Sequence, residues 1–151
     1  QAKNWYDSGV YAIFSAAGGT GNGTIAQAKE YRVQGKNVWA IGVDSDQFQD
    51  GIYTGNKSAV LTSMLKRVET STLVALKAVQ AGTFKGGVVT FDTKNEGVGF
   101  STSNPELSKA IVSKVEAVKK DIIAGKIAIV PTYAEAKAKG LVPSNLQASD
   151  N

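Results

Sequence analysis

Short apolar runs alternate with polar, glycine-containing segments in the first part of the chain. The runs Val10–Phe14 and Asn37–Val43 are rich in β-branched and aromatic residues, which is typical of strands buried in a parallel sheet. Between them, segment 16–23 is rich in glycine and predicts a loop, and Thr24 with Gln27 has the spacing of a capping box that begins a helix. A strand, a glycine loop, a helix and a second strand in this order predict a parallel βαβ unit.

Apolar residues recur at helical spacing in the middle of the chain. Residues 60–63 lead into a predicted helix from about Met64 to Ala81. Asn104 as the N-cap and Pro105 at the first position predict a further helix that ends at Gly125. Its apolar face consists of Leu107, Ile111, Val115, Val118 and Ile122.

Shorter elements fill the remaining sequence. The segments Gly87–Phe91 and Val98–Ser101 flank a turn-rich stretch, so they predict a β-hairpin. A last strand, Ile127–Val130, is expected before Pro131, followed by a short helix over Thr132–Lys139. The polar tail after Pro143 is expected to fray.

Composition indicates a folded protein and argues against a nucleic-acid partner. The 151 residues are 42% hydrophobic and 20% charged, close to globular averages. The 17 Lys and Arg residues are scattered among 13 acids and give a net charge of +4. A nucleic-acid surface normally shows clustered cations with interleaved aromatic residues, and no such cluster is present in the sequence.

The residue types that most often carry enzyme chemistry are missing. The sequence contains no cysteine and no histidine, which excludes thiolate nucleophiles, disulfides, a Ser-His-Asp triad and imidazole metal ligands. We therefore expect no enzyme, no catalytic residue, no bound metal and no cofactor. Gln1–Ser8 has the pattern of the end of a helix stopped by Gly9, so we expect the chain to be a fragment with any secretion signal upstream.

Polar residues that could bind a ligand follow both strands of the predicted βαβ unit. Gly21–Ala26 matches a relaxed dinucleotide-binding pattern, and Asp44 lies where a ribose-binding acid should follow. A glycine turn and a carboxylate at the strand ends suit either a dinucleotide or a nucleoside. Asp44 with Asp46 could also form a metal site, a carboxylate pair for acid and base chemistry, or a plain polar loop. Lys66, placed in the first turn of the predicted helix, is easier to explain if its ammonium reaches a ligand or Asp44.

Three linked motifs carry a resemblance to a known family. They are Ala16–Gly21 (AAGGTG), Ile41–Gln47 (IGVDSDQ) and Leu61–Val68 (LTSMLKRV). In order and spacing they resemble the basic membrane protein (BMP) family, which includes purine nucleoside receptors of ABC transporters. Asn22 departs from the expected glycine-loop pattern and is given no function.

The resemblance implies an α/β fold of the type I periplasmic binding protein kind, with Rossmann-like lobes. Residues 1–151 would form the C-terminal portion of a two-lobed protein whose N-terminal half is absent. By similarity Gly18, Asp44 and Lys66 hold the ribose of a nucleoside, while the aromatic residues that sandwich the base belong mostly to the preceding half. The implied protein is a lipoprotein on the extracytoplasmic face of the cell membrane that delivers nucleosides to an ABC transporter permease.

Two other functions stay open from the sequence. One is a nucleotide-dependent oxidoreductase that uses the glycine loop and Asp44, with Tyr133 and Lys137 at the spacing of a proton-transfer pair. The other is a sensor of the same family that binds a ligand without transport. Trp39 and Trp5 are expected to pack in the core or between lobes instead of stacking on a ligand.

Overall fold

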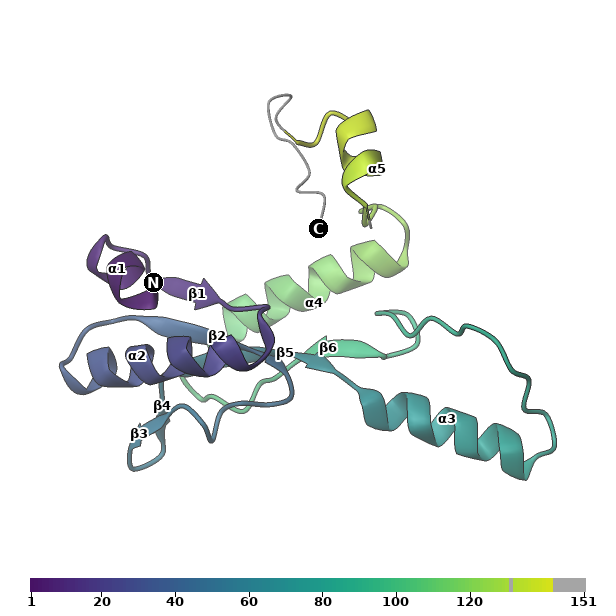
Figure 1. Cartoon of the computed structure of the whole chain (residues 1–151), viewed down its shortest axis with the longest axis horizontal. Coiled ribbons are helices and arrows are strands. Elements are labelled where there is room, and N and C mark those ends of the chain that lie inside the picture. Colours follow the sequence, from purple (N-terminus) through teal and green to yellow (C-terminus); the bar gives the residue numbers. More distant parts are fainter. Residues whose placement is uncertain (131, 143–151) are drawn as a thin grey trace. The chain divides into compact units, whose positions relative to one another are not determined.

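A four-stranded sheet in the order β1-β2-β5-β6 is the centre of the first part of the chain (Figure 1). The structure is a computed structural model that describes residues 1–130 and 132–142. The chain divides into two units, Gln1–Val115 and Glu116–Asn151. In the first unit β1, β2 and β5 are parallel and β6 is antiparallel to β5; these strands are Ala12–Phe14, Trp39–Asp44, Val60–Lys66 and Val98–Phe100. The predicted α/β class with a parallel sheet is confirmed.

The predicted βαβ unit is present, but its helix begins earlier than expected. A 3₁₀ turn, η1 (Gly18–Thr20), runs directly into α2 (Gly21–Val33). The predicted capping box does not form, because Thr24 already lies inside α2. Thr24 is buried, and its hydroxyl forms a hydrogen bond with the Ser15 hydroxyl at 2.8 Å. The glycines suggested a loop, yet the backbone at Gly21 has helical angles, with φ at −57° and ψ at −30°. The dinucleotide-like pattern therefore lies inside a helix.

The core lies between α2, β2 and the helix that precedes β1. The predicted helix before Gly9 is α1 (Ala2–Asp7), and Gly9 follows it with a φ of +93°. α2 packs against β2 and α1 packs against α2. The buried cluster consists of Tyr6, Ile13, Ile25, Ala28, Tyr31, Val38, Ala40, Ala59 and Val60. The Tyr6 hydroxyl donates a hydrogen bond to the Trp39 carbonyl at 2.9 Å, which satisfies a polar group inside this cluster.

The segment from Val60 to Lys66 is strand throughout, so the predicted helix start at Met64 is wrong. β5 adds to the far side of β2, with Met64 opposite Val43 in the parallel register. The helix that follows, α3, covers Val68–Gln80. A small hairpin of β3 (Ile52–Thr54) and β4 (Lys57–Ser58) precedes β5 and was not predicted.

The predicted hairpin of 87–91 with 98–101 does not form. β6 instead pairs with β5, with Lys66 opposite Val98. Segment 87–91 is not a strand, and Val88 is fully exposed. Between that segment and β6 the chain forms a turn over residues 92–97, in which the Gly97 amide donates a hydrogen bond to the Asp92 carbonyl at 2.8 Å. β6 begins directly after this turn.

The strongest helical pattern forms α4 (Lys109–Ile123), which begins later than predicted. Asn104 is buried, and its side-chain amide donates to the carbonyl of Val60 at 2.7 Å. Its side-chain oxygen accepts from the Glu106 amide at 2.8 Å, so Asn104 holds a turn beside β5 instead of capping α4. The predicted end at Gly125 is confirmed, since Gly125 has a φ of +73°.

The second unit contains the predicted short helix. This helix, α5, covers Tyr133–Ala138, and the Thr132 hydroxyl caps it by accepting from the Glu135 amide at 3.2 Å. The predicted strand 127–130 is wrong: the described residues of this unit offer it no strand to pair with. Pro131 and the tail from residue 143 lie outside the described residues. Among the described helices, none combines the length and the apolar character needed to cross a membrane.

Candidate functional site

Gly18, Asp44 and Lys66 all follow or end parallel strands at one edge of the sheet. Asp44 is the last residue of β2 and Lys66 the last residue of β5, while Gly18 follows the end of β1 at Phe14. The register places Asp44 opposite Leu65, next to Lys66. Because β1 and β2 are parallel, Gly18 and Asp44 share one strand-end edge, as expected for residues that follow the two strands of the predicted βαβ unit. Open α/β sheets bind ligands at this edge.

The backbone at two of these residues is left-handed. Gly18 has a φ of +52°, and a Cβ built there would meet no atom within 4 Å. Asp44 has a φ of +71°, a conformation that few residues other than glycine, asparagine and aspartate adopt. Because of it, the chain reverses at the end of β2, and the Ser45 amide donates to the Val43 carbonyl at 3.0 Å.

The charged groups of Asp44 and Lys66 are exposed. In the part of the chain that the structure describes, neither side chain forms a hydrogen bond or an ion pair. Lys66 is the last residue of β5, so the prediction that it lies in the first turn of a helix is wrong. Both groups are nonetheless open to a ligand at the sheet edge.

Asp46 differs from Asp44 because its carboxylate is engaged. It accepts hydrogen bonds from the Ser103 hydroxyl and, at 3.1 Å, from the Phe48 amide. Partial burial acts to raise the pKa of Asp46, but the hydrogen bonds from Ser103, Phe48 and Ser101 outweigh it and the net pKa is lowered. No cluster of three or more metal-binding side chains occurs among the described residues, so Asp44 and Asp46 gain no further acidic ligand.

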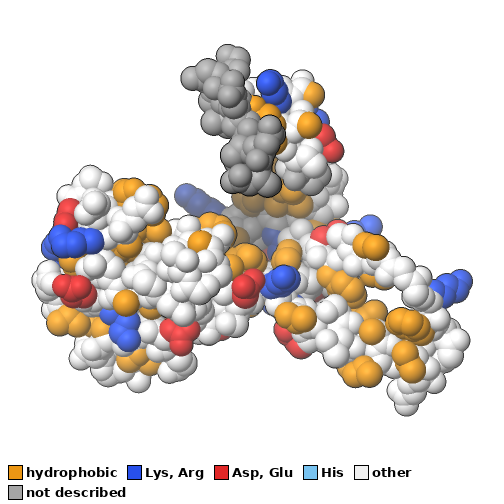
Figure 2. All heavy atoms as spheres, in the orientation of Figure 1, with side chains coloured by type: hydrophobic (Ala, Val, Ile, Leu, Met, Phe, Trp, Pro, Cys, Tyr) orange, Lys and Arg blue, Asp and Glu red, His pale blue; other side chains and the backbone are white. Residues whose placement is uncertain are grey.

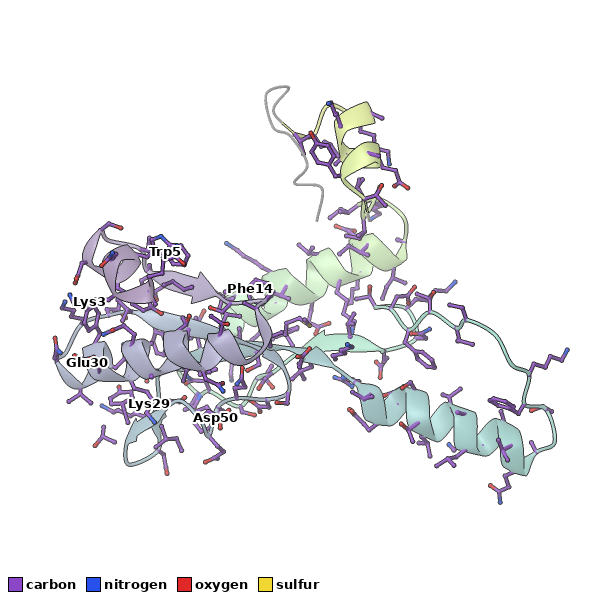
Figure 3. All side chains as sticks on the ribbon, in the orientation of Figure 1. Lys3, Trp5, Phe14, Lys29, Glu30 and Asp50 are labelled. Carbon is purple, nitrogen blue, oxygen red and sulfur yellow. The ribbon has the colours of Figure 1, made fainter. Side chains whose placement is uncertain are left out.

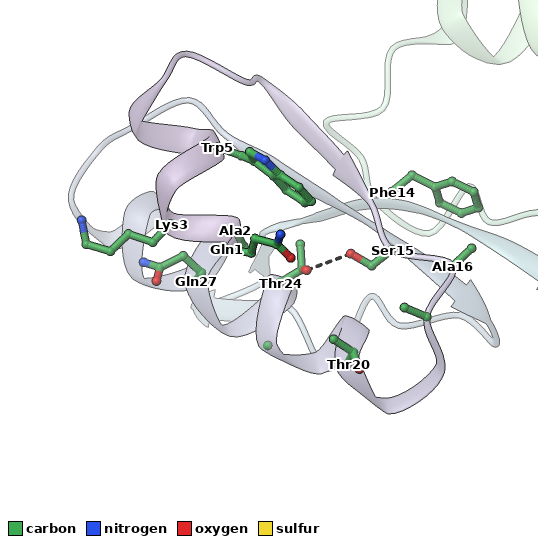
Figure 4. Close-up of a pocket in the computed structure, with 12 residues that line it drawn as sticks. Gln1, Ala2, Lys3, Trp5, Phe14, Ser15, Ala16, Thr20, Thr24 and Gln27 are labelled. Carbon is green, nitrogen blue, oxygen red and sulfur yellow. Dashed lines mark hydrogen bonds between the residues drawn. The ribbon is translucent and has the colours of Figure 1, made fainter. Parts of the chain in front are cut away.

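Two cavities border this edge. One, of about 420 Å³, lies beside the glycine segment and includes Trp5, Phe14 and Ser15 in its wall (Figure 4). Trp5 and Phe14 are 45% and 52% exposed, so Trp5 lies outside the core, and its predicted packing between lobes stays a prediction. The other, of about 350 Å³, is lined by Lys66, Arg67 and apolar residues near Phe91.

Trp39 is buried, as predicted, and interacts with a cation. It is 4% exposed, and the guanidinium of Arg32 lies 4.0 Å from its ring centroid. Arg32 also pairs with Glu106 at 2.9 Å. Trp39 therefore packs inside the lobe and does not face the strand-end edge.

Sequence reasoning missed the polar side chains that hold the loop after β2. Gln47 is the main one: its side chain and backbone contact β2 and β5. Asn22, which was given no function, lies 3.4 Å from the Gln47 amide nitrogen. The only signal in the sequence was the position of Gln47 inside the IGVDSDQ motif.

A parallel α/β lobe with polar residues at its strand ends belongs to the class of open α/β sheets that bind small ligands at this edge. The chain belongs to the Bmp family, described as "ABC transporter substrate-binding protein PnrA-like", whose model matches residues 1–132.

Curated relatives agree with this assignment. The chain is 38% identical over 135 residues to a "CD4+ T-cell-stimulating antigen" of Listeria monocytogenes, and the match covers 85% of this chain and 38% of the relative. It is 35% identical over 136 residues to the "ABC transporter nucleoside-binding protein BmpA" of Lactococcus lactis, again covering 85% and 38%. The chain thus spans well under half the length of these relatives.

Solved structures show the same fold. A solute-binding protein of an ABC transporter system from Aeropyrum pernix K1 superposes with a TM-score of 0.69 at 24% identity. The superposition covers 91% of this chain and 45% of that protein.

Proposed function

We propose that residues 1–151 form the C-terminal portion of an extracytoplasmic receptor that binds a nucleoside between two lobes and delivers it to an ABC transporter. The main observation behind this proposal is that Gly18, Asp44 and Lys66 lie at the same strand-end edge of the sheet. In this arrangement the ligand is a nucleoside, with purine nucleosides favoured by the family resemblance.

The chemistry of the three residues suits a ribose. A carboxylate such as that of Asp44 accepts hydrogen bonds from two sugar hydroxyls, and a lysine ammonium donates to sugar oxygens. Gly18 lets the backbone approach the sugar, since the space at its Cβ position is open. In a cleft closed to water, such charge-assisted bonds are stronger than neutral ones.

The second lobe belongs to the preceding half of the same protein in this proposal. β1 lies at the edge of the described sheet, and two exposed apolar residues, Phe14 at the end of β1 and Trp5 in α1, are suited to contact another segment. The share of each relative that the chain covers supports a longer protein. The preceding half would supply the aromatic residues around the base and the lipid anchor to the outer face of the cell membrane.

The receptor proposed here has no catalytic function. The family is described by substrate binding for transport, not by a reaction. The glycine pattern that suggested an oxidoreductase, Gly21–Ala26, begins α2 directly after η1. Backbone amides at this junction donate to the carbonyls of Gly18 and Gly19 in η1, so they are already engaged. Nucleic acid is not a partner in this proposal.

Binding of ligands to the two-lobed receptor, purified without denaturation, tests the proposal. Native mass spectrometry should detect a retained nucleoside, and calorimetry should show tighter binding of the nucleoside than of its free base or of a dinucleotide. Tighter binding of the dinucleotide would contradict it. Loss of nucleoside uptake in cells that lack the receptor separates transport from sensing, because a sensor would leave uptake through the permease unchanged.

A further inference from the structure

Gln47 lies three residues after Asp44 and connects the loop that follows β2 to its neighbours. Its side-chain oxygen accepts a hydrogen bond from the Val43 amide at 3.0 Å. Its own backbone amide donates to the Ser63 hydroxyl on β5 at 3.1 Å. The two contacts bind the loop to both strands that carry Asp44 and Lys66.

The contact to Val43 replaces a missing strand. The Trp39 amide donates to Tyr11 on the β1 side at 2.9 Å, and the alternation of a parallel ladder directs the Val43 amide to that same side. β1, however, ends at Phe14, opposite Ile41, so Val43 has no partner strand there. The Gln47 side chain satisfies this amide and holds the backbone next to Asp44.

The contact to Ser63 requires a glycine in β2. A Cβ at Gly42 would overlap the Ser63 hydroxyl and would lie only 3.0 Å from both the Cβ and the side-chain oxygen of Gln47. Ser63 is fully buried. The absence of a side chain at Gly42 therefore makes room for the loop to fold back onto the sheet.

The outer end of Gln47 is attached to α2 and to its own loop. Its amide nitrogen donates to the Asp50 carboxylate at 3.2 Å and reaches Asn22 of α2 at 3.4 Å. The Lys29 ammonium of α2 donates a hydrogen bond to the Asp50 carbonyl at 3.2 Å; both residues are labelled in Figure 3. The loop is thus fixed to α2, β2 and β5 at once.

We propose that Gln47 is a positioning residue for the ribose grip: it touches no ligand but holds Asp44 in the left-handed conformation that presents its carboxylate at the sheet edge. This inference rests on the proposed function, because the affinity it controls is that for a sugar. The proposal explains the left-handed backbone of Asp44. The Gln47 side chain bonds to the backbone amide of Val43, so the segment 43–47 is closed around Asp44.

Substitution of Gln47 in the two-lobed receptor tests the inference. Gln47→Met keeps the length of the side chain and removes its hydrogen bonds, while Gln47→Glu keeps the acceptor for the Val43 amide. Gln49→Met is the matched control, because Gln49 is exposed in the same loop and no side-chain bond is described for it. The measurements are calorimetric affinities for a nucleoside and its free base, and hydrogen exchange at the Val43 amide.

Gln47→Met should weaken nucleoside binding about tenfold, with little change for the free base, and should speed exchange at Val43. Gln47→Glu should retain more of the exchange protection than Gln47→Met, and Gln49→Met should match the unmutated protein. Equal losses for nucleoside and base, or unchanged exchange at Val43 in Gln47→Met, would overturn the inference.

Failure of the proposed function gives a different result. If Asp44→Ala leaves nucleoside affinity intact, the ribose grip is wrong whatever Gln47 does. If Asp44→Ala abolishes the preference for the nucleoside and Gln47→Met does not reduce it, the grip stands and the positioning role of Gln47 falls.

Discussion

At the residue scale, the two acids after β2 differ in what they contact. Asp46 is held by Ser103 and by the Phe48 amide, whereas Asp44 has no partner among the described residues. A carboxylate that already accepts hydrogen bonds within the lobe has less capacity for a sugar. This difference agrees with the proposed division, in which Asp44 would bind the ribose while Asp46 holds the loop.

Asp44→Ala should cause the largest loss of nucleoside affinity. Removal of charge-assisted bonds to two hydroxyls costs about 1.5–3 kcal/mol, or roughly ten- to a hundredfold in affinity. Lys66→Ala should also weaken binding, and Asp46→Ala should weaken it less. Calorimetry with nucleoside and free base measures this, and affinity for the base should change little. Equal losses for both ligands in the Asp44 and Lys66 variants would show that these residues do not hold the ribose.

A second residue-scale prediction concerns alkaline pH. Burial raises the pKa of Tyr6 to about 12 from an ordinary value of 10. Because the folded-state pKa is the higher one, the neutral hydroxyl stabilises the fold fully below about pH 10, and this stabilisation is lost as the pH rises toward 12. Tyr6→Phe should cost about 1 kcal/mol at neutral pH, since the Trp39 carbonyl loses its donor, and should reduce the loss of stability above pH 10.

Urea unfolding of the two-lobed receptor between neutral and alkaline pH measures both effects. Tyr11→Phe is the matched control, because Tyr11 is 53% exposed and its hydroxyl forms no described hydrogen bond. A Tyr6→Phe variant with an alkaline stability curve parallel to that of the unmutated protein would refute the assignment to Tyr6.

At the element scale, the pairing of β2 with β5 sets the spacing between Asp44 and Lys66. Gly42 of β2 lies opposite Ser63 of β5 in the register, and the Ser63 hydroxyl fills the space where a side chain of residue 42 would lie. This close approach connects strand pairing to the proposed binding edge through one glycine and one buried serine.

Gly42→Ala should lower the free energy of unfolding by about 1–3 kcal/mol, because the new methyl overlaps the Ser63 hydroxyl in a packed site. In a double-mutant cycle, Ser63→Ala should recover part of this loss, since it removes the overlapping atom. Gly23→Ala is the control, because a Cβ there meets no atom within 4 Å. Additive effects of Gly42→Ala and Ser63→Ala would mean that the two residues do not conflict.

The sequence predicted those elements whose limits depend on local signals. Gly9 and Gly125 follow helices that end where expected, with left-handed backbones that glycine adopts without strain. Thr132 caps α5 through its own hydroxyl. Such features involve residues a few positions apart, so a single sequence contains the information.

Errors arose where distant partners decide the structure. Met64 and Leu65 fit a helix as well as a strand, and only the open side of β2 selects the strand. Asn104 has the signature of a helix cap, yet its amide bonds to Val60 on β5. The same holds for the candidate site. Asp44 was proposed from its place after a predicted strand, whereas the contact between Gln47 and Ser63 joins segments that the sequence does not relate.

At the scale of the whole molecule, α3 presents an apolar surface that the other residues of the first unit do not cover. α3 has no buried residue, and Leu73, Leu76 and Val79 are 51%, 61% and 60% exposed. Figure 2 shows hydrophobic side chains on the outside of this helix. An amphipathic helix in a folded protein normally buries such residues, so we expect the preceding half of the receptor to cover them.

Leu76→Glu on α3 tests this expectation in two settings. In the isolated 151-residue chain, sedimentation should show self-association through the uncovered apolar face, and Leu76→Glu should reduce it. In the two-lobed receptor the same change should lower the free energy of unfolding by about 2 kcal/mol or more, because a carboxylate would be buried without a partner. Gln80→Glu adds the same charge at an exposed polar position of α3. It should change neither the self-association of the isolated chain nor the free energy of unfolding of the two-lobed receptor. A stable monomer with cooperative unfolding from the isolated chain would show that α3 needs no cover, and the two-lobed arrangement would lose its support from this face.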